Sequence, residues 1–406
     1  MKRLVCVMCL AAIAAVVAED RRDHVLRRLE SVNPANVRMA WEDMAKRWPG
    51  RFEANPKWLQ TFERDRKRLM NAIMGDWGPY YGELPPIDGG EKFLADLRAR
   101  LLQNPLLDAD RLLVIRRRQN ALGLYQNWNQ PRDLFAGCTN ELGVLSNLRG
   151  KPTFKVLDAT PANGYLGEVC LHWDATRAMY TRRTDRVDHP PKTGDETRAV
   201  EAIHRVFELD LTQPGAKPRE IELIPDADVN CYAGCYLPDG ALIFLSDASM
   251  VGVPCVRGHS WVASFYRREK TGGIRRLTFD QDNNWCPNVM PDGRVMYLHW
   301  EYSGITHYAS RRLFTMNPDG TTQRAYYGSD SYWPNALFNA RVCPDNPDRF
   351  TATVTGHHGQ PRFGELVLFD VNKGRKHADG VVQRFPERGK PVEPVEIGRA
   401  SCRERV

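Results

Sequence analysis

Several short motifs that mark common enzyme classes are missing from this sequence. It contains no CxxCH haem-attachment motif, no glycine-rich phosphate loop and no GxSxG nucleophile elbow. Its longest apolar run, Leu4–Val17, falls short of the roughly 18 to 20 residues that span a bilayer, and no later run matches it. These absences argue against a haem attached within these residues, P-loop nucleotide chemistry, α/β-hydrolase chemistry and a membrane anchor.

The apolar run has the pattern of an export signal. Lys2 and Arg3 precede it, and Ala18 supplies the small residue that a signal peptidase requires. We therefore expect residues 1–18 to be a cleaved signal peptide and the mature chain to begin near Glu19, in the periplasm or outside the cell.

Residues 397–406 break the pattern of the proline- and glutamate-rich stretch before them. They read as a translated sequencing adapter, so we expect the natural sequence to continue past Glu396. The net charge falls from +7 to +3 when the charged residues of the signal and this tail are left out, namely Lys2, Arg3, Arg399, Arg403, Glu404 and Arg405. There is no basic stripe with interleaved aromatic residues, so a nucleic-acid partner is not indicated.

Seven cysteines remain outside the signal and the tail: Cys138, Cys170, Cys231, Cys235, Cys255, Cys286 and Cys343. Some of them could pair in an oxidising compartment, and the odd number leaves at least one without a partner among these seven. The connectivity does not follow from the sequence.

Apolar residues between positions 19 and 105 recur at helical spacing, as in Phe62, Leu69 and Ile73. The stretch Gly75–Gly90, rich in glycine, proline and tyrosine, divides this part into two halves. We expect an N-terminal helical segment over residues 19–105.

From residue 106 the pattern changes to short β runs, and one unit recurs. An aspartate-led turn precedes a strand-like run at a spacing of 53 to 65 residues, at Asp110, Asp174, Asp239, Asp292 and Asp348. At 238–240 and 291–293 the turn is Pro-Asp-Gly, in which glycine takes the positive φ that a tight hairpin requires.

A second hairpin follows in each unit, most clearly at 265–277, 313–324 and 365–375. Two hairpins make a four-stranded sheet that cannot bury both of its faces alone, so radial stacking is the stable solution. We predict an all-β propeller over residues 106–396, with WD40- or TolB-like blades of which five are visible, in a complete ring of six or seven. A β-sandwich is the alternative, but it would not need this long regular period.

The starts of first strands and the ends of second strands lie on one face of a propeller. The candidate ligand-binding residues at this predicted mouth are Asp282, Trp285, His299, Glu301, Tyr302, Tyr332, Trp333, His357 and His358. The structural alternative is that the aspartate and tryptophan residues hydrogen-bond neighbouring turns and close the blades.

Histidines are the candidates for a metal or haem contact. Glycines flank His357 and His358 and leave the two imidazoles presented, so we expect at least one to be solvent-accessible and to point toward the channel. His299 is the third candidate, with Glu301 close to it in sequence, but no local ligand spacing supports a tetrahedral zinc site. Catalytic residues are not indicated.

Several motifs together resemble the hydrazine synthase alpha subunit middle-domain family, which is abundant in planctomycetes. The resemblance covers about residues 104–396 and rests on Asn104–Arg117, Cys235–Gly240, Gly252–Cys255, Phe279–Asp282, Tyr297–Tyr302, Leu313–Gly320, Tyr327–Ala336, Val354–Gly359 and Ala378–Arg384. It implies a propeller that, in hydrazine synthase, belongs to a multihaem enzyme joining ammonium and nitric oxide. Because this sequence has no haem-attachment motif, we do not extend hydrazine synthesis to it.

Two functions therefore remain open. In the first, the chain is an exported propeller of a periplasmic redox or catabolic system, with no cofactor held by these residues and a c-type haem or metal in the full-length protein. In the second, it is a non-catalytic TolB-like propeller that binds a peptide, a glycan or a protein partner.

Overall fold

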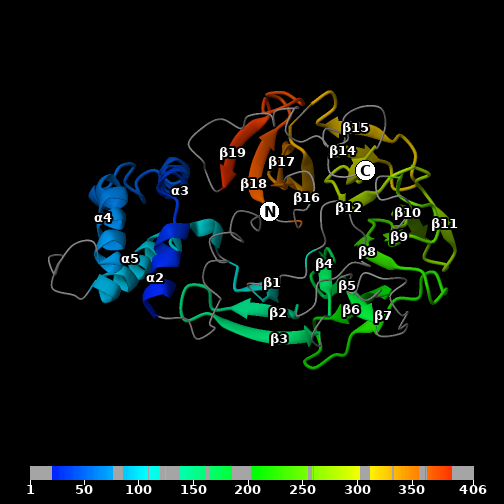
Figure 1. The fold of residues 1–406 in the computed structure, drawn as a ribbon, viewed down its shortest axis with the longest axis horizontal. Coiled ribbons are helices and arrows are strands. Elements are labelled where there is room, and N and C mark those ends of the chain that lie inside the picture. Colours follow the sequence, from blue (N-terminus) through cyan, green and yellow to red (C-terminus); the bar gives the residue numbers. More distant parts are fainter. Residues whose placement is uncertain are drawn as a thin grey trace. The chain divides into compact units, whose positions relative to one another are not determined.

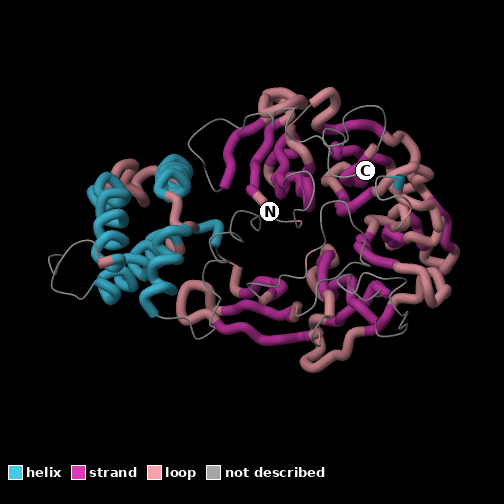
Figure 2. The backbone as a smooth tube through the Cα atoms, in the orientation of Figure 1, coloured by secondary structure: helices cyan, strands magenta, loops and turns pink. Residues whose placement is uncertain are grey.

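The computed structural model describes residues 21–75, 86–107, 109–118, 124, 138–160, 164–184, 203–254, 258, 260–301, 311–331, 333–355, 362 and 364–385. The described residues form two compact units. Helices make up one unit and strands make up most of the other (Figure 2).

The N-terminal unit contains the helices α2 (Arg21–Ser31), α3 (Pro34–Arg47), α4 (Lys57–Met74) and α5 (Pro86–Leu101), followed by the 3-10 turn η1 (Pro105–Leu107). The Asn33 side chain caps α3 by accepting from the backbone N–H of Ala35 and of Asn36, and α4 ends at Gly75, which has a φ of 87°. The apolar stripes of these helices pack on one another around Trp41, Met44 and Phe62. The predicted N-terminal helices are thus observed. No helix in the described ranges has the length and apolarity needed to cross a membrane.

The strand-rich unit is a five-bladed β-propeller built from antiparallel sheets (Figure 1). The first sheet has three described strands, β1 (Arg111–Arg117), β2 (Asn140–Ser146) and β3 (Thr153–Ala159). The second contains β4 (Leu166–Leu171), β5 (Arg177–Thr184), β6 (Ile203–Asp210) and β7 (Arg219–Glu220), and the third β8 (Cys231–Tyr236), β9 (Leu242–Ser246), β10 (Ser264–Arg268) and β11 (Ile274–Arg276).

The fourth sheet contains β12 (Asn284–Val289), β13 (Val295–Trp300), β14 (Arg311–Met316) and β15 (Arg324–Tyr327). The fifth contains β16 (Ala336–Cys343), β17 (Asn346–Thr355), β18 (Glu365–Asp370) and β19 (Val381–Phe385). Successive sheets contact one another through their first strands, β4 with β8, β8 with β12, and β12 with β16. The predicted propeller is therefore confirmed, with β4, β8, β12 and β16 as its inner strands.

The predicted aspartate-glycine hairpins are confirmed in the third and fourth blades. The side chain of Asp239 accepts from the N–H of Ala241 at 3.0 Å, and Gly240 has a φ of 82°. Asp292 bonds the N–H of Arg294 in the same way, and Gly293 has a φ of 86°. The fifth blade differs, because Asp348 lies inside β17 and the turn precedes Asn346.

Apolar cores fill the spaces between blades. One cluster joins Leu245 of β9 and Phe265 of β10 to Tyr297 of β13, and all three side chains are fully buried or nearly so. A larger cluster joins Trp285 of β12 to Phe338 of β16. Because each sheet covers the face of the next, the repeat buries apolar area that one blade could not bury alone.

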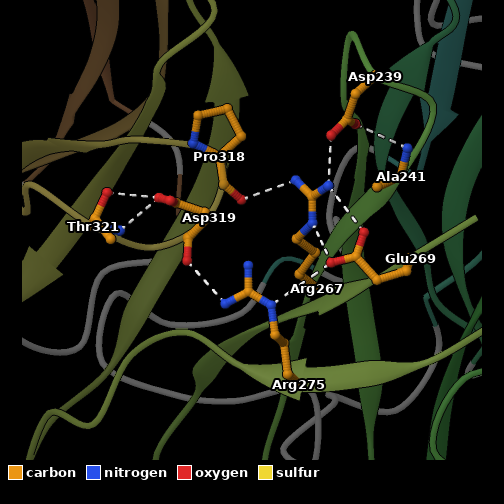
Figure 3. A network of polar contacts seen from close by, with 8 residues as sticks. All are labelled: Asp239, Ala241, Arg267, Glu269, Arg275, Pro318, Asp319 and Thr321. Carbon is orange, nitrogen blue, oxygen red and sulfur yellow. Dashed lines mark hydrogen bonds and ion pairs between the residues drawn. The ribbon is translucent and has the colours of Figure 1, made fainter.

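Polar contacts also cross between blades at the hairpin ends. Arg267 of β10 forms ion pairs with Asp239 and Glu269 of its own blade and donates to the carbonyl of Pro318 in the next blade (Figure 3). Arg275 of β11 donates to the carbonyl of Asp319 at 3.0 Å (Figure 3). The hairpins of the third and fourth blades are therefore tied together on the same side.

Candidate functional site

Four inner strands share a local irregularity that the sequence analysis did not anticipate. Each of β4, β8, β12 and β16 shifts register against its neighbour, β16 at two points, and one shift in each strand contains a residue other than glycine with a φ between 49° and 55°. These residues are Glu168, Ala233, Cys286 and Asn339. A bulge of this kind turns a side chain away from the regular alternation of a strand and is frequent beside functional sites. The repeat therefore places one redirected side chain per blade along the inner strands.

Glu168 is the most unusual of the four. Its side chain is only 13% exposed, and one carboxyl oxygen, Oε2, has no hydrogen-bond partner among the residues that the structure describes. The other oxygen, Oε1, lies 3.9 Å from Nη1 of Arg362. Burial raises the pKa of Glu168, and hydrogen bonding with Thr181 and Tyr165 together with the charge of Arg362 opposes that shift without cancelling it. A buried carboxyl with an unpaired oxygen is the type of group that binding sites use.

Arg362 is held in place by aromatic rings. Its guanidinium lies 5.3 Å from the ring centre of Trp285 and 5.0 Å from that of Phe338. The residue is nearly buried, with 9% exposure. Cation–π contacts of this kind strengthen when the cation is removed from water. The aromatic residues of β12 and β16 thus hold a positive charge beside the carboxyl of β4.

Tyr232 and Cys286 complete the group, which we call the inner-strand cluster: Glu168, Tyr232, Cys286 and Arg362. Burial raises the pKa of the Tyr232 phenol and that of the Cys286 thiol, and the charges of Arg362 and Glu168 act on both groups. Four segments of the chain therefore contribute to one polar cluster.

Several arginines act electrostatically on the groups of the cluster. Arg362 and Arg117 both act on Glu168, and Arg341 acts together with Arg362 on Cys286. The nearby carboxylate of Asp247 is engaged by the N–H and the amide of Asn230, at 2.7 and 2.8 Å. Among the residues that the structure describes and that act on these groups, the three arginines thus outnumber the two carboxylates.

His299 and Glu301, predicted at the mouth, lie together at the end of β13. The imidazole Nδ1 of His299 is 2.9 Å from Oδ1 of Asn284, and its Nε2 is 3.3 Å from Glu301. The ring packs on Phe314 at 4.4 Å and is only 6% exposed. The hydrogen bond from His299 lowers the pKa of Glu301. Both ring nitrogens of His299 thus have partners within the protein.

Trp285, Trp333 and Asp282 are also buried. Trp285 stacks on Trp300 with ring centres 5.8 Å apart, and Trp333 packs on Phe369. Asp282 is 2% exposed at the turn before β12. In the structure the two tryptophans belong to the apolar core, and Trp285 also contacts Arg362 of the inner-strand cluster.

The remaining mouth candidates, Tyr302, Tyr332, His357 and His358, lie outside the described residues. Their expected positions stay predictions.

Within the described ranges, no three or more histidine, cysteine, aspartate or glutamate side chains are grouped closely enough to hold a metal ion. His299 therefore has no set of metal ligands among those residues.

Sequence reasoning missed Glu168, Cys286 and Arg362. A signal was present in the repeat itself, because Leu166-Gly-Glu-Val-Cys, Cys231-Tyr-Ala-Gly-Cys, Asn284-Trp-Cys-Pro-Asn and Leu337-Phe-Asn-Ala-Arg align at the bulge. The aligned third position contains Glu168 in β4, and glutamate is rarely buried in the interior of a protein.

The fold and the cluster define a β-propeller with a polar site among its inner strands. No protein-family model matches the chain, and no curated protein matches it. Among solved structures it is similar to hydrazine synthase of Kuenenia stuttgartiensis, with 14% identity and a TM-score of 0.50 over 68% of this chain. The chain spans 38% of the length of that hydrazine synthase chain.

A putative TolB from Agrobacterium tumefaciens also matches, with 17% identity and a TM-score of 0.38 over 65% of this chain and 90% of that one. An oligogalacturonate lyase matches with 14% identity and a TM-score of 0.36, over 61% of this chain and 62% of that one. At these identities the similarity to hydrazine synthase shows the propeller fold alone.

Proposed function

We propose that this chain is an exported propeller that binds a small carboxylate anion at the inner-strand cluster and serves a periplasmic redox or catabolic system. The observation that carries the binding proposal is the buried oxygen Oε2 of Glu168, which has no partner among the described residues. A buried polar atom left unpaired costs about 1–3 kcal/mol, and a ligand that pairs with it recovers that free energy.

The charges around the cluster favour a negatively charged ligand. Arg362, Arg117 and Arg341 all act on its groups, against the two carboxyl groups of Glu168 and Asp247. An anion is favoured by this balance, and guanidinium groups match the two oxygens of a carboxylate. The limited exposure of Glu168 and Arg362 restricts the ligand to a small one.

Protonation of Glu168 makes the site more receptive to an anion. Burial raises its pKa, so the carboxyl retains its proton at a pH where an exposed glutamate has lost it. A protonated Oε2 can donate to an oxygen of the ligand, whereas an ionised Oε2 repels it. Binding is then strong below the pKa of Glu168 and weakens as the pH rises through it.

Thermal unfolding with sodium acetate tests this proposal, with sodium chloride at equal ionic strength as the control. We expect acetate to raise the unfolding temperature of the wild type, and the acetate affinity to fall about tenfold per pH unit above the pKa of Glu168. Glu168→Gln keeps a donor in place of the carboxylic acid, so its acetate affinity should stay high and independent of pH.

Glu301→Gln is the matched control, since it changes a carboxylate directly after β13 that has hydrogen-bonding partners but is 41% exposed. It should retain the pH dependence of the wild type. An equal response to acetate and chloride would contradict the proposal. So would an unfolded Glu168→Gln protein, because Glu168 would then serve only to hold Arg362 in place, and the TolB-like scaffold function would be favoured.

Export and the redox or catabolic setting rest on the sequence. The signal pattern of residues 1–18 supports export, and the resemblance to the hydrazine synthase family supports the setting, including a c-type haem or metal in the full-length protein. N-terminal sequencing of the protein from a periplasmic extract should begin near Glu19. An intact Met1 in that protein would contradict export through a cleaved signal.

A further inference from the structure

Two cysteines face each other across neighbouring blades. Cys170 of β4 and Cys235 of β8 have their sulfur atoms 4.0 Å apart, although 65 positions separate them in the sequence. Each is the residue at which its strand regains register after the inner bulge. The repeat therefore brings two equivalent positions of adjacent blades into contact.

We propose that Cys170 and Cys235 form a thiol-disulfide site that links the second and third blades when the protein meets a small-molecule disulfide. The sulfur atoms are in van der Waals contact and need to approach by about 2 Å to reach the disulfide bond length. Small side-chain rotations can supply part of this movement, because both residues lie beside bulges rather than within a regular ladder.

The two thiols differ in a way that sets the order of events. Cys170 is partly exposed, and its hydrogen bond with Cys235 lowers its pKa against the opposing effect of burial, while the N–H of Tyr236 and the charge of Arg341 also lower it. Cys235 is 3% exposed, and its proximity to Cys170 together with burial raises its pKa. Cys170 is then the nucleophile and Cys235 the resolving thiol.

The reaction balances with glutathione disulfide as oxidant. The Cys170 thiolate attacks one sulfur of glutathione disulfide, forms a mixed disulfide and releases one glutathione thiolate. Cys235 then loses its proton and attacks the sulfur of Cys170, which releases the second glutathione. The two protein thiols lose two electrons in total, glutathione disulfide gains them, and the two protons end on the two glutathione molecules.

Mass spectrometry of peptides after incubation with glutathione disulfide tests this assignment in the full chain. We expect a Cys170–Cys235 cross-linked peptide in the wild type. Cys235→Ser should accumulate glutathione on Cys170, because the resolving thiol is missing, whereas Cys170→Ser should leave Cys235 unmodified. Cys343→Ser, at another partly exposed cysteine, should still form the cross-link.

Alkylation by iodoacetamide gives a second measurement. In the reduced wild type, Cys170 should react at a lower pH than Cys343, whose pKa is raised by burial. The difference should shrink in Cys235→Ala, which removes the hydrogen-bonding thiol. Cross-links distributed among other cysteines, or stable glutathione adducts on Cys235, would overturn the proposal. Neither readout depends on acetate binding, so failure here leaves the function of Glu168 open.

Discussion

At the scale of single residues, stability is concentrated where charged groups are both buried and paired. Arg267 is 10% exposed and contacts two carboxylates and the backbone of the next blade (Figure 3). Its neighbour Arg275 contributes to the same network but is 49% exposed. Burial, rather than the number of ion pairs, should decide how much each arginine contributes.

We predict that Arg267→Met lowers the free energy of unfolding by about 1.5–3 kcal/mol, the range for hydrogen bonds to charged groups. Arg275→Met should change it by less than about 0.5 kcal/mol. Arg267 lowers the pKa of Glu269, and it also lowers that of Asp239 against the opposing effect of burial, so its contribution is present above their ordinary pKa values and is lost as the pH falls. Urea unfolding at pH 7 and pH 3 measures both effects, and an equal loss for the two variants would contradict the ranking.

At the scale of elements, the hairpins depend on backbone conformation rather than on side-chain space. Gly293 has a φ of 86°, and a Cβ atom added there would have no neighbour within 4 Å. Gly273 has equally open surroundings but no positive φ. Because neither site is crowded, a comparison of the two substitutions isolates the free-energy cost of a left-handed backbone.

We predict that Gly293→Ala destabilises the protein by about 1–2 kcal/mol, because alanine is disfavoured in the left-handed region. Gly273→Ala should be neutral or slightly stabilising, since alanine reduces the freedom of the unfolded chain. Chemical denaturation of both variants provides the comparison. A similar loss for the two would mean that hairpin glycines are needed for a reason other than φ.

Asparagines connect neighbouring blades at the strand ends that lie away from the aspartate-glycine hairpins. Asn230 accepts from the N–H of His204 in the preceding blade at 2.9 Å, and Asn283 accepts in the same manner from Ala263. Asn230 also bonds the buried Asp247. This agrees with the alternative in which polar residues at the mouth close the blades.

We predict that Asn230→Ala lowers the free energy of unfolding by about 2–4 kcal/mol, because it removes several buried hydrogen bonds and leaves the Asp247 carboxylate with fewer donors. Asn317→Ala, at an exposed turn that is held by Thr321 and Thr322, should cost less than about 1 kcal/mol. A smaller loss for Asn230 than for Asn317 would argue against its role in joining blades.

At the scale of the whole molecule, the sequence predicted the architecture better than the site. The long period and the Pro-Asp-Gly turns indicated blades because a turn is encoded by a few neighbouring residues. The burial of Trp285 and His299 was not predictable from their positions alone, since it depends on which face of β12 and β13 the next blade covers.

The inner-strand cluster was beyond sequence reasoning for a related reason. Glu168, Cys286 and Arg362 are distant in the chain, and only the bulges direct Glu168 and Cys286 away from the regular alternation. One register shift per strand reverses the face expected for a side chain. A repeat alignment that includes the bulge would have marked the position, although not its partner Arg362.

The most direct test of the central claim is the acetate affinity of the wild type and of Glu168→Gln as a function of pH. We predict that the wild type loses acetate affinity as the pH rises through the raised pKa of Glu168, while the glutamine variant binds acetate equally well across the range. If the two proteins show the same pH dependence, or if neither distinguishes acetate from chloride, Glu168 is not a ligand-binding group.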